Sequence, residues 1–92
     1  MPGAHVVKAF NTTFAGPLAT GEVGGRPLDV FIAGDDEGAR TTVSELVSSA
    51  GLRPLDVGPL RRARELEGFQ FLHMASQERL GLKWSSAVTI LP

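Results

Sequence analysis

The chain has 92 residues, a hydrophobic content of 42% and a formal net charge of −1, which indicates one domain with a modest core and argues against nucleic acid and membrane surfaces as partners. Because it contains no cysteine, disulfides and thiolate metal sites are excluded, and its two histidines are too few to form a metal site without carboxylates. No apolar run approaches the roughly 20 residues that span a bilayer and none suits a signal peptide, so we expect a cytoplasmic protein.

The first predicted element is a strand over residues 5–10, which is apolar and β-branched at its start. Such a run is typical of a strand covered on both faces, and Lys8 within it is expected to extend toward solvent. Asn11 and Thr12 follow directly. Ligands of open α/β sheets bind just past the carboxyl ends of the strands, so these two residues are the candidate binding residues. Asn11 can donate and accept hydrogen bonds, while its simpler interpretation is a turn residue after a strand.

The next segment is expected to hold a short helix, a loop and a second strand. Thr12 or Thr13 can cap a helical turn over residues 14–20. The three glycines and one proline of residues 21–27 indicate a loop. Residues 28–33 include four consecutive apolar residues, which again predict a strand covered on both faces.

A longer helix is predicted after that strand and ends at Gly51. Asp35 or Asp36 can cap its first turn, and Glu37 suits the positive end of the helix dipole. The same three acidic residues are also a candidate ligand cluster, although helix capping explains them fully. The apolar stripe of this helix comprises Ala39, Val43, Leu46, Val47 and Ala50.

A third strand is predicted at residues 54–57, and a long helix then begins at Pro59 and continues to about Leu80. Its apolar positions are Leu60, Ala63, Leu66, Phe69, Leu72 and Ala75. His73 on this helix is interpreted as a packed or surface histidine.

Three arginines, Arg61, Arg62 and Arg64, fall in the first turns of the long helix, where cations are mildly disfavoured. One interpretation is a nearby anion such as a phosphate, which stays open for Arg64. The other is a solvated face with the ion pairs Arg61–Glu65 and Arg64–Glu67.

Residues 1–82 are predicted to form a half domain, and residues 83–92 an apolar tail without an obvious partner strand. We expect this tail to form a strand or to be exchanged with a second copy.

The sequence contains no recognisable nucleotide-binding or catalytic motif. G-x-G-x-x-G and G-x-x-x-x-G-K-[ST] are both absent, and the cluster Gly21, Gly24 and Gly25 has the wrong spacing. No serine lies within G-x-S-x-G, so a hydrolase triad has no support. We predict no catalytic side chain and no metal site.

Four segments occur in order: VVKAFNT at residues 6–12, VFIAGDD at 30–36, DVGPL at 56–60 and ARELE at 63–67. From about residue 6 to about residue 82 the chain resembles the C-terminal part of the NADPH-dependent reductases of coenzyme F420, a deazaflavin, and their NADP-binding relatives. The resemblance implies that Asn11 and Thr12 face the nicotinamide and the acceptor. It also implies that the long helix contributes to dimer contacts.

The order of elements and the resemblance imply an α/β fold. We expect the C-terminal half of a Rossmann-like doubly wound sheet, with about three mainly parallel strands and flanking helices, and without the N-terminal dinucleotide-binding half. A C-terminal fragment is favoured over a short stand-alone relative, because strands covered on both faces need the missing sheet. Apolar faces left bare predict a homo-oligomer.

For the complete enzyme, the resemblance implies hydride transfer between NADPH and coenzyme F420 or a related acceptor. This reaction needs two juxtaposed cofactor rings rather than an acid or a base. Because the glycine fingerprint is missing, we expect this chain alone to bind neither cofactor well and to be inactive or nearly so. The alternative is a non-catalytic dimerisation or ligand-binding module that reuses the half-fold.

Overall fold

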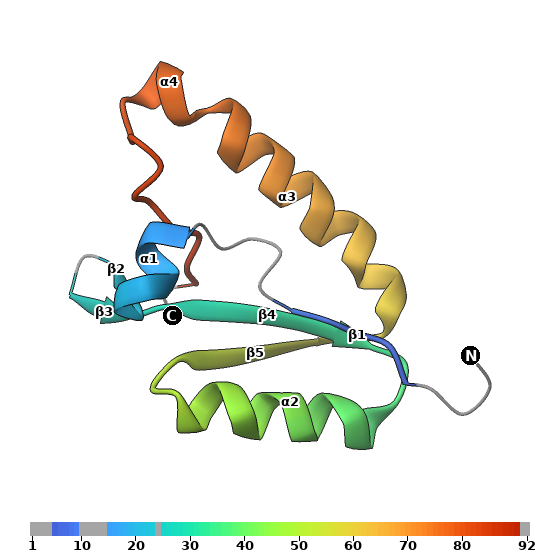
Figure 1. Cartoon of the computed structure of the whole chain (residues 1–92). Coiled ribbons are helices and arrows are strands. Elements are labelled where there is room, and N and C mark those ends of the chain that lie inside the picture. The colour runs from blue at the N-terminus through green and yellow to red at the C-terminus, as the bar shows by residue number, and fades with distance from the viewer. Residues whose placement is uncertain (1–4, 10–14, 24, 91–92) are drawn as a thin grey trace.

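The computed structural model describes residues 5–9, 15–23 and 25–90. A three-stranded sheet forms the middle layer, with helix α2 on one face and helix α3 on the other (Figure 1). The strands are β1 (Val7–Lys8), β2 (Glu22–Val23), β3 (Arg26–Pro27), β4 (Asp29–Gly34) and β5 (Arg53–Gly58). The helices are α1 (Ala15–Thr20), α2 (Glu37–Ser49), the 3-10 helix η1 (Leu60–Arg62), α3 (Ala63–Ala75) and α4 (Gln77–Leu80). The expected Rossmann-like half fold is confirmed.

The main sheet has the order β1-β4-β5, so β4 is its central strand. β4 runs parallel to β5, as predicted, whereas β1 runs antiparallel to β4, with Val7 opposite Gly34 and Lys8 opposite Ala33. The sheet is therefore mixed. β1 lies at one edge, with one side paired to β4 and no neighbour assigned to the other side within the described part of the chain.

The central strand β4 is buried along its whole length, which confirms the prediction of a strand covered on both faces. Its side chains alternate between two clusters, as the period of a strand requires. Val30 and Ile32 pack against Val47 of α2. Phe31 and Ala33 pack against Leu66 of α3.

Helix α2 has the predicted capping. Asp36 is the N-cap, and its Oδ2 atom accepts a hydrogen bond from the Ala39 amide at 2.7 Å. Gly51 follows the helix with φ +81°, a conformation that glycine adopts without steric cost. The predicted apolar stripe is only partly right, because Val47 is buried while Leu46 is 65% exposed.

Two sequence-based predictions about secondary structure were wrong. Residues 21–27, expected as a loop, contain the β2–β3 hairpin, in which Gly25 occupies the turn with φ +77° and the Leu28 amide donates to the Gly21 carbonyl. The expected long helix to Leu80 is divided into η1, α3 and α4, with Ser76 between α3 and α4. The structure places no strand at residues 82–90; strand formation or exchange of this tail with a second copy stays a prediction.

Helix α3 is mostly unpacked. Ala63 and Leu66 are its buried residues, and the helix rises obliquely away from the sheet (Figure 1). Phe69 and Leu72, predicted core positions of its second half, are therefore 54% and 63% exposed. Within the described residues, no helix is both long and apolar enough to cross a membrane.

Candidate functional site

The two predicted binding residues, Asn11 and Thr12, lie outside the described residues, and their role stays a prediction. The direction of β1, the strand that precedes them, is established by the structure. Because β1 is antiparallel to β4 and β5, its carboxyl end points away from the carboxyl ends of those two strands. The carboxyl end of β1 is therefore at the opposite end of the sheet from the segments that follow β4 and β5.

The carboxyl ends of β4 and β5 are closed by the chain's own hydrogen bonds. Asp36 caps α2, and Asp35 Oδ1 accepts from the Leu60 amide at 3.0 Å, at the start of η1. Asp56 Oδ1 accepts from the Gly58 amide at 2.9 Å. The capping interpretation of the acidic residues is confirmed for Asp36. Carboxylates thus occupy both helix starts where a phosphate group would otherwise bind.

Arg40 of α2 joins these loops together. Its Nε atom lies 2.9 Å from Asp56 Oδ1, and its Nη1 atom donates to the Gly34 carbonyl at 2.5 Å. The Arg40 side chain is only 16% exposed, so it acts as a structural cation between β4 and β5.

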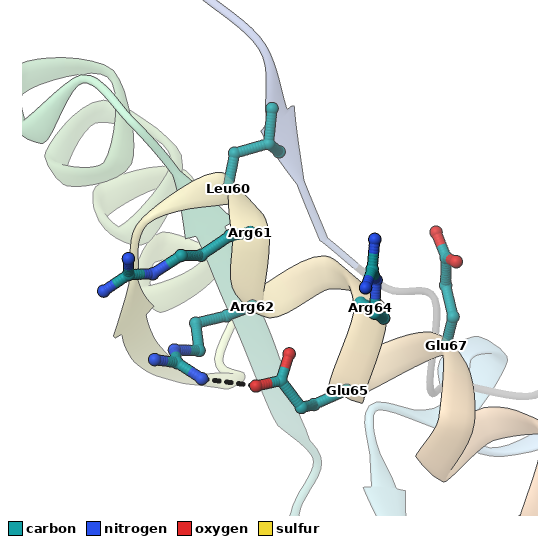
Figure 2. Close-up of a pocket in the computed structure, with 6 residues that line it drawn as sticks. All are labelled: Leu60, Arg61, Arg62, Arg64, Glu65 and Glu67. Carbon is teal, nitrogen blue, oxygen red and sulfur yellow. Dashed lines mark hydrogen bonds and ion pairs between the residues drawn. The ribbon is translucent and has the colours of Figure 1, made fainter.

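Figure 2 shows an open hollow of about 560 Å³ around the start of α3. It is lined by Leu60, Arg61, Arg62, Arg64, Glu65 and Glu67. The arginine side chains do not converge, since Arg61 and Arg64 point in different directions (Figure 2). Arg61 and Arg62 point to one side of the hollow (Figure 2), and Arg62 is already paired with Glu65.

The ion pairs of this hollow differ from those predicted. Glu65 pairs with Arg62 instead of Arg61, and Glu67 pairs with Lys8 of β1 at 3.2 Å instead of with Arg64. The Glu65 backbone amide and then Arg62 lower the pKa of the Glu65 carboxyl. The pair Lys8–Glu67 could not be found from spacing along the helix, because it depends on α3 passing over β1.

A second hollow, of about 510 Å³, lies between α3, α4 and the tail. Its floor includes Gln77, which is 2% exposed and whose Oε1 atom accepts from the Trp84 amide at 2.8 Å. That bond fixes Lys83 and Trp84 in the left-handed region, with φ 58° and 60°, a conformation that costs such residues energy. The Trp84 indole is 53% exposed beside this hollow.

His73 is a half-buried histidine that helps to hold the tail. Its Nε2 atom lies 2.7 Å from Ser86 Oγ, and Ser86 Oγ also accepts from Gln77 Nε2 at 3.0 Å. Burial lowers the pKa of His73, so the imidazole is neutral at pH 7. This agrees with the interpretation of His73 as a packed residue.

The most completely bonded charged group is one that the sequence interpretation missed. The Asp29 side chain is only 1% exposed. Its carboxylate accepts hydrogen bonds from Arg53 Nε at 2.6 Å, Arg53 Nη2 at 2.5 Å, Thr89 Oγ1 at 2.6 Å and the Ile90 amide at 2.9 Å. Burial alone would raise its pKa, but these hydrogen bonds lower the pKa of Asp29 to about 2. The sequence did contain a sign of this buried group, because Asp29 directly precedes the apolar run of β4.

No group of three or more His, Asp or Glu side chains suited to a metal ion occurs among the described residues. The described side chains also include no convergent acid, base and nucleophile. What they form is a packed sheet with hydrogen-bonded strand ends and several open hollows along α3 and the tail.

Comparison with known proteins shows two reductases to which this chain is similar. No protein-family model matches the chain. Metalloreductase STEAP3 of Rattus norvegicus is 46% identical over 66 residues, which are 72% of this chain and 13% of the rat protein. A crystal structure of a protein proposed to be an F420-dependent NADP reductase, from Arthrobacter sp. FB24, superposes with a TM-score of 0.86 and 29% identity. The superposition covers 99% of this chain and 41% of that protein.

The chain spans less than half the length of either of these proteins. Both of these proteins are nevertheless named as reductases, and one of the likenesses extends over nearly the whole chain. The chain is therefore similar to a part of an F420-reductase-like NADP oxidoreductase.

Proposed function

We propose that this chain is the C-terminal domain of an enzyme that transfers hydride between NADPH and coenzyme F420 or a related acceptor. The observation that carries the proposal is the superposition of nearly the whole chain on the Arthrobacter protein at 29% identity. The likeness to a metalloreductase, at higher identity over a shorter segment, supports reductase chemistry while favouring a wider range of acceptors.

The described residues do not fit a dinucleotide by themselves. A pyrophosphate binds to exposed amides at a helix start. At the starts of α2 and η1, Asp36 and Asp35 accept those amide hydrogens and place negative charge there. The sequence also lacks the glycine fingerprint. These features support the proposal that NADPH is held by another part of the protein and that this chain is inactive alone.

The contribution proposed for this chain is to position the acceptor. Hydride transfer between two rings depends on their placement. Asn11 and Thr12, which follow β1 in the sequence, are the proposed contacts to the nicotinamide and acceptor, as the resemblance implies. We also propose a cytoplasmic location, which rests on the sequence alone.

Replacing Asn11 with Ala is expected to raise KM for the acceptor about tenfold, as the loss of one hydrogen bond worth about 1.4 kcal/mol would do. The protein to use is this chain joined to the part of the Arthrobacter protein that it does not match. NADPH oxidation with coenzyme F420 as acceptor is the measurement, and Thr13→Ala is the control. Unchanged kinetics for Asn11→Ala would remove Asn11 from the site, and absence of any NADPH oxidation in the parent protein would refute hydride transfer.

A non-catalytic dimerisation module is the second candidate. It is favoured by the exposed apolar residues of α3, of which Phe71 is 75% exposed and Leu72 is 63% exposed. Such side chains are normally covered by a partner, so a homo-oligomer is part of this proposal. Hydride transfer by the joined protein decides between the two candidates.

A further inference from the structure

The tail, residues 82–90, runs from α4 back toward the start of β4 (Figure 1). Val88 packs against the buried cluster between β4 and α3. Thr89 Oγ1 and the Ile90 amide donate hydrogen bonds to Asp29 at 2.6 Å and 2.9 Å. We call the Asp29 carboxylate and the cluster that Val88 contacts the tail-binding surface. This surface fits a segment with the sequence of the tail, whichever copy of the chain supplies that segment.

The connection between α4 and the tail, residues 81–84, has a strained backbone. Gly81 ends α4 with φ 66°, and Lys83 and Trp84 follow with φ 58° and 60°. Residues with a Cβ atom adopt this left-handed region at a cost in energy, and here two do so in succession. The turn is held by the Trp84 amide, which donates to Oε1 of the buried Gln77 at 2.8 Å. An extended connection would release this strain.

Exposed apolar side chains lie beside the connection. Leu80 of α4 is 64% exposed, Trp84 is 53% exposed and Met74 is 44% exposed. Met74 and Trp84 line the same hollow, and we call the three residues the hinge patch. An extended chain spans only about 3.3–3.6 Å per residue, so a short connection that crossed to a second copy would bring the two hinge patches together. Covering these side chains would stabilise such a pair.

We propose that two copies of this chain exchange their tails, so that each tail lies on the tail-binding surface of the other copy. The connection then crosses between the copies in an extended conformation. The contacts of Val88, Thr89 and Ile90 are the same as before, except that they join two chains. The partner is therefore a second copy, which supplies the sequence that the surface fits. The inference goes beyond the proposed function, because exchange concerns assembly alone and is independent of hydride transfer.

The balance of contacts favours exchange at high protein concentration. The hydrogen bond from the Trp84 amide to Gln77 is lost, while Ser86 Oγ of the exchanged tail stays 3.4 Å from Gln77 Oε1. One hydrogen bond contributes about as much as the strain at one left-handed residue costs, and the strain is released at two residues in each copy. Association also costs freedom of movement, so the dimer is favoured only when the chain is concentrated.

The first test compares two variants of the connection by sedimentation equilibrium. Lys83→Gly with Trp84→Gly removes the strain from the single copy, because glycine adopts positive φ freely. The matched control, Lys83→Ala with Trp84→Ala, removes the same side chains but keeps the Cβ atoms and therefore the strain. We expect the dimer dissociation constant of the Gly variant to be at least about tenfold that of the Ala variant. Equal constants, or a parent chain that stays monomeric at millimolar concentration, would overturn the inference.

The second test uses the unaltered chain and distinguishes exchange from side-by-side association. Copies labelled with ¹³C are unfolded and refolded together with unlabelled copies, and isotope-filtered NMR then detects contacts between the two kinds of copy. We expect contacts between Val88 of one copy and Phe31 or Leu66 of the other, since Val88 packs against this cluster. A dimer in which Val88 contacts the cluster only within its own copy would contradict exchange. Neither test depends on NADPH oxidation, so failure of the proposed function would leave both results unchanged.

Discussion

Replacing Asp29 with Asn is expected to destabilise the chain by roughly 2–3 kcal/mol and to release the tail, because a buried carboxylate that accepts four hydrogen bonds from three residues loses its charge. The cost stays below that of a fully buried ion pair, since the Arg53 side chain is 42% exposed and regains water. Urea denaturation measures the loss, and faster amide exchange at residues 88–90 reports release of the tail. Glu45→Gln, on an exposed position of α2, is the control, with an expected change below about 0.5 kcal/mol. A loss no larger than that of the control would contradict the role of Asp29.

The same carboxylate predicts how stability depends on pH. The pKa of Asp29 is about 2 in the folded chain against 3.8 for the unperturbed group. A lowered pKa means that this stabilisation is fully present above about pH 4 and is lost as the pH falls toward 2, by about 2 kcal/mol in all. The Asn variant is expected to lack this loss. His73 affects stability over a different pH range. Because burial lowers its pKa in the folded chain, protonation of the unfolded chain reduces the free energy of unfolding as the pH falls below about 6.5.

Replacing Ile32 with Ala is expected to cost roughly 3–4 kcal/mol, the range for removing a large aliphatic side chain from a packed core. Ile32 of β4 is completely buried on the face of the sheet that α2 covers, in one cluster with Val30 and Val47. A domain of this size has a total stability of roughly 5–10 kcal/mol, so the variant is expected to be largely unfolded at moderate urea concentrations.

The control for this substitution is Leu46→Ala on α2, a position that the sequence pattern assigned to the core. Leu46 is 65% exposed, so we expect a loss below about 1 kcal/mol, measured in the same urea titrations. Similar losses for the two variants would contradict the described packing of α2 against β4.

The elements that the sequence predicted well are those specified by local chemistry. β4 follows from a run of consecutive apolar residues, and α2 follows from Asp36 as a cap and Gly51 as an ending. The short helix α1 and the strand β5 also lie where they were expected, because turn residues delimit them.

The errors concern features that depend on contacts distant in sequence. The apolar period through Phe69 and Leu72 predicted a packed helix, but α3 leaves the sheet after Leu66 and exposes both side chains. The pairing of Glu67 with Lys8 and the burial of Asp29 against Ile90 join residues about sixty positions apart. Periodicity carries no information on such contacts.

The candidate site was predictable only in part. The sequence predicted that this chain holds no complete dinucleotide site, and this stays a prediction; Asp35 and Asp36 accept hydrogen bonds from amides at the starts of η1 and α2, in keeping with it. Which way β1 runs was not predictable, since one apolar strand fits a parallel or an antiparallel neighbour equally well. The direction of β1 determines at which end of the sheet its carboxyl end lies.

The central claim is that this chain is one part of an NADP oxidoreductase and that its dinucleotide site lies in another part. Calorimetric titration with NADPH tests it most directly, first on the 92-residue chain and then on the chain joined to the unmatched part of the Arthrobacter protein. We expect no binding at micromolar NADPH for the chain alone and micromolar binding for the joined protein. Micromolar NADPH binding by the 92-residue chain alone would contradict the claim.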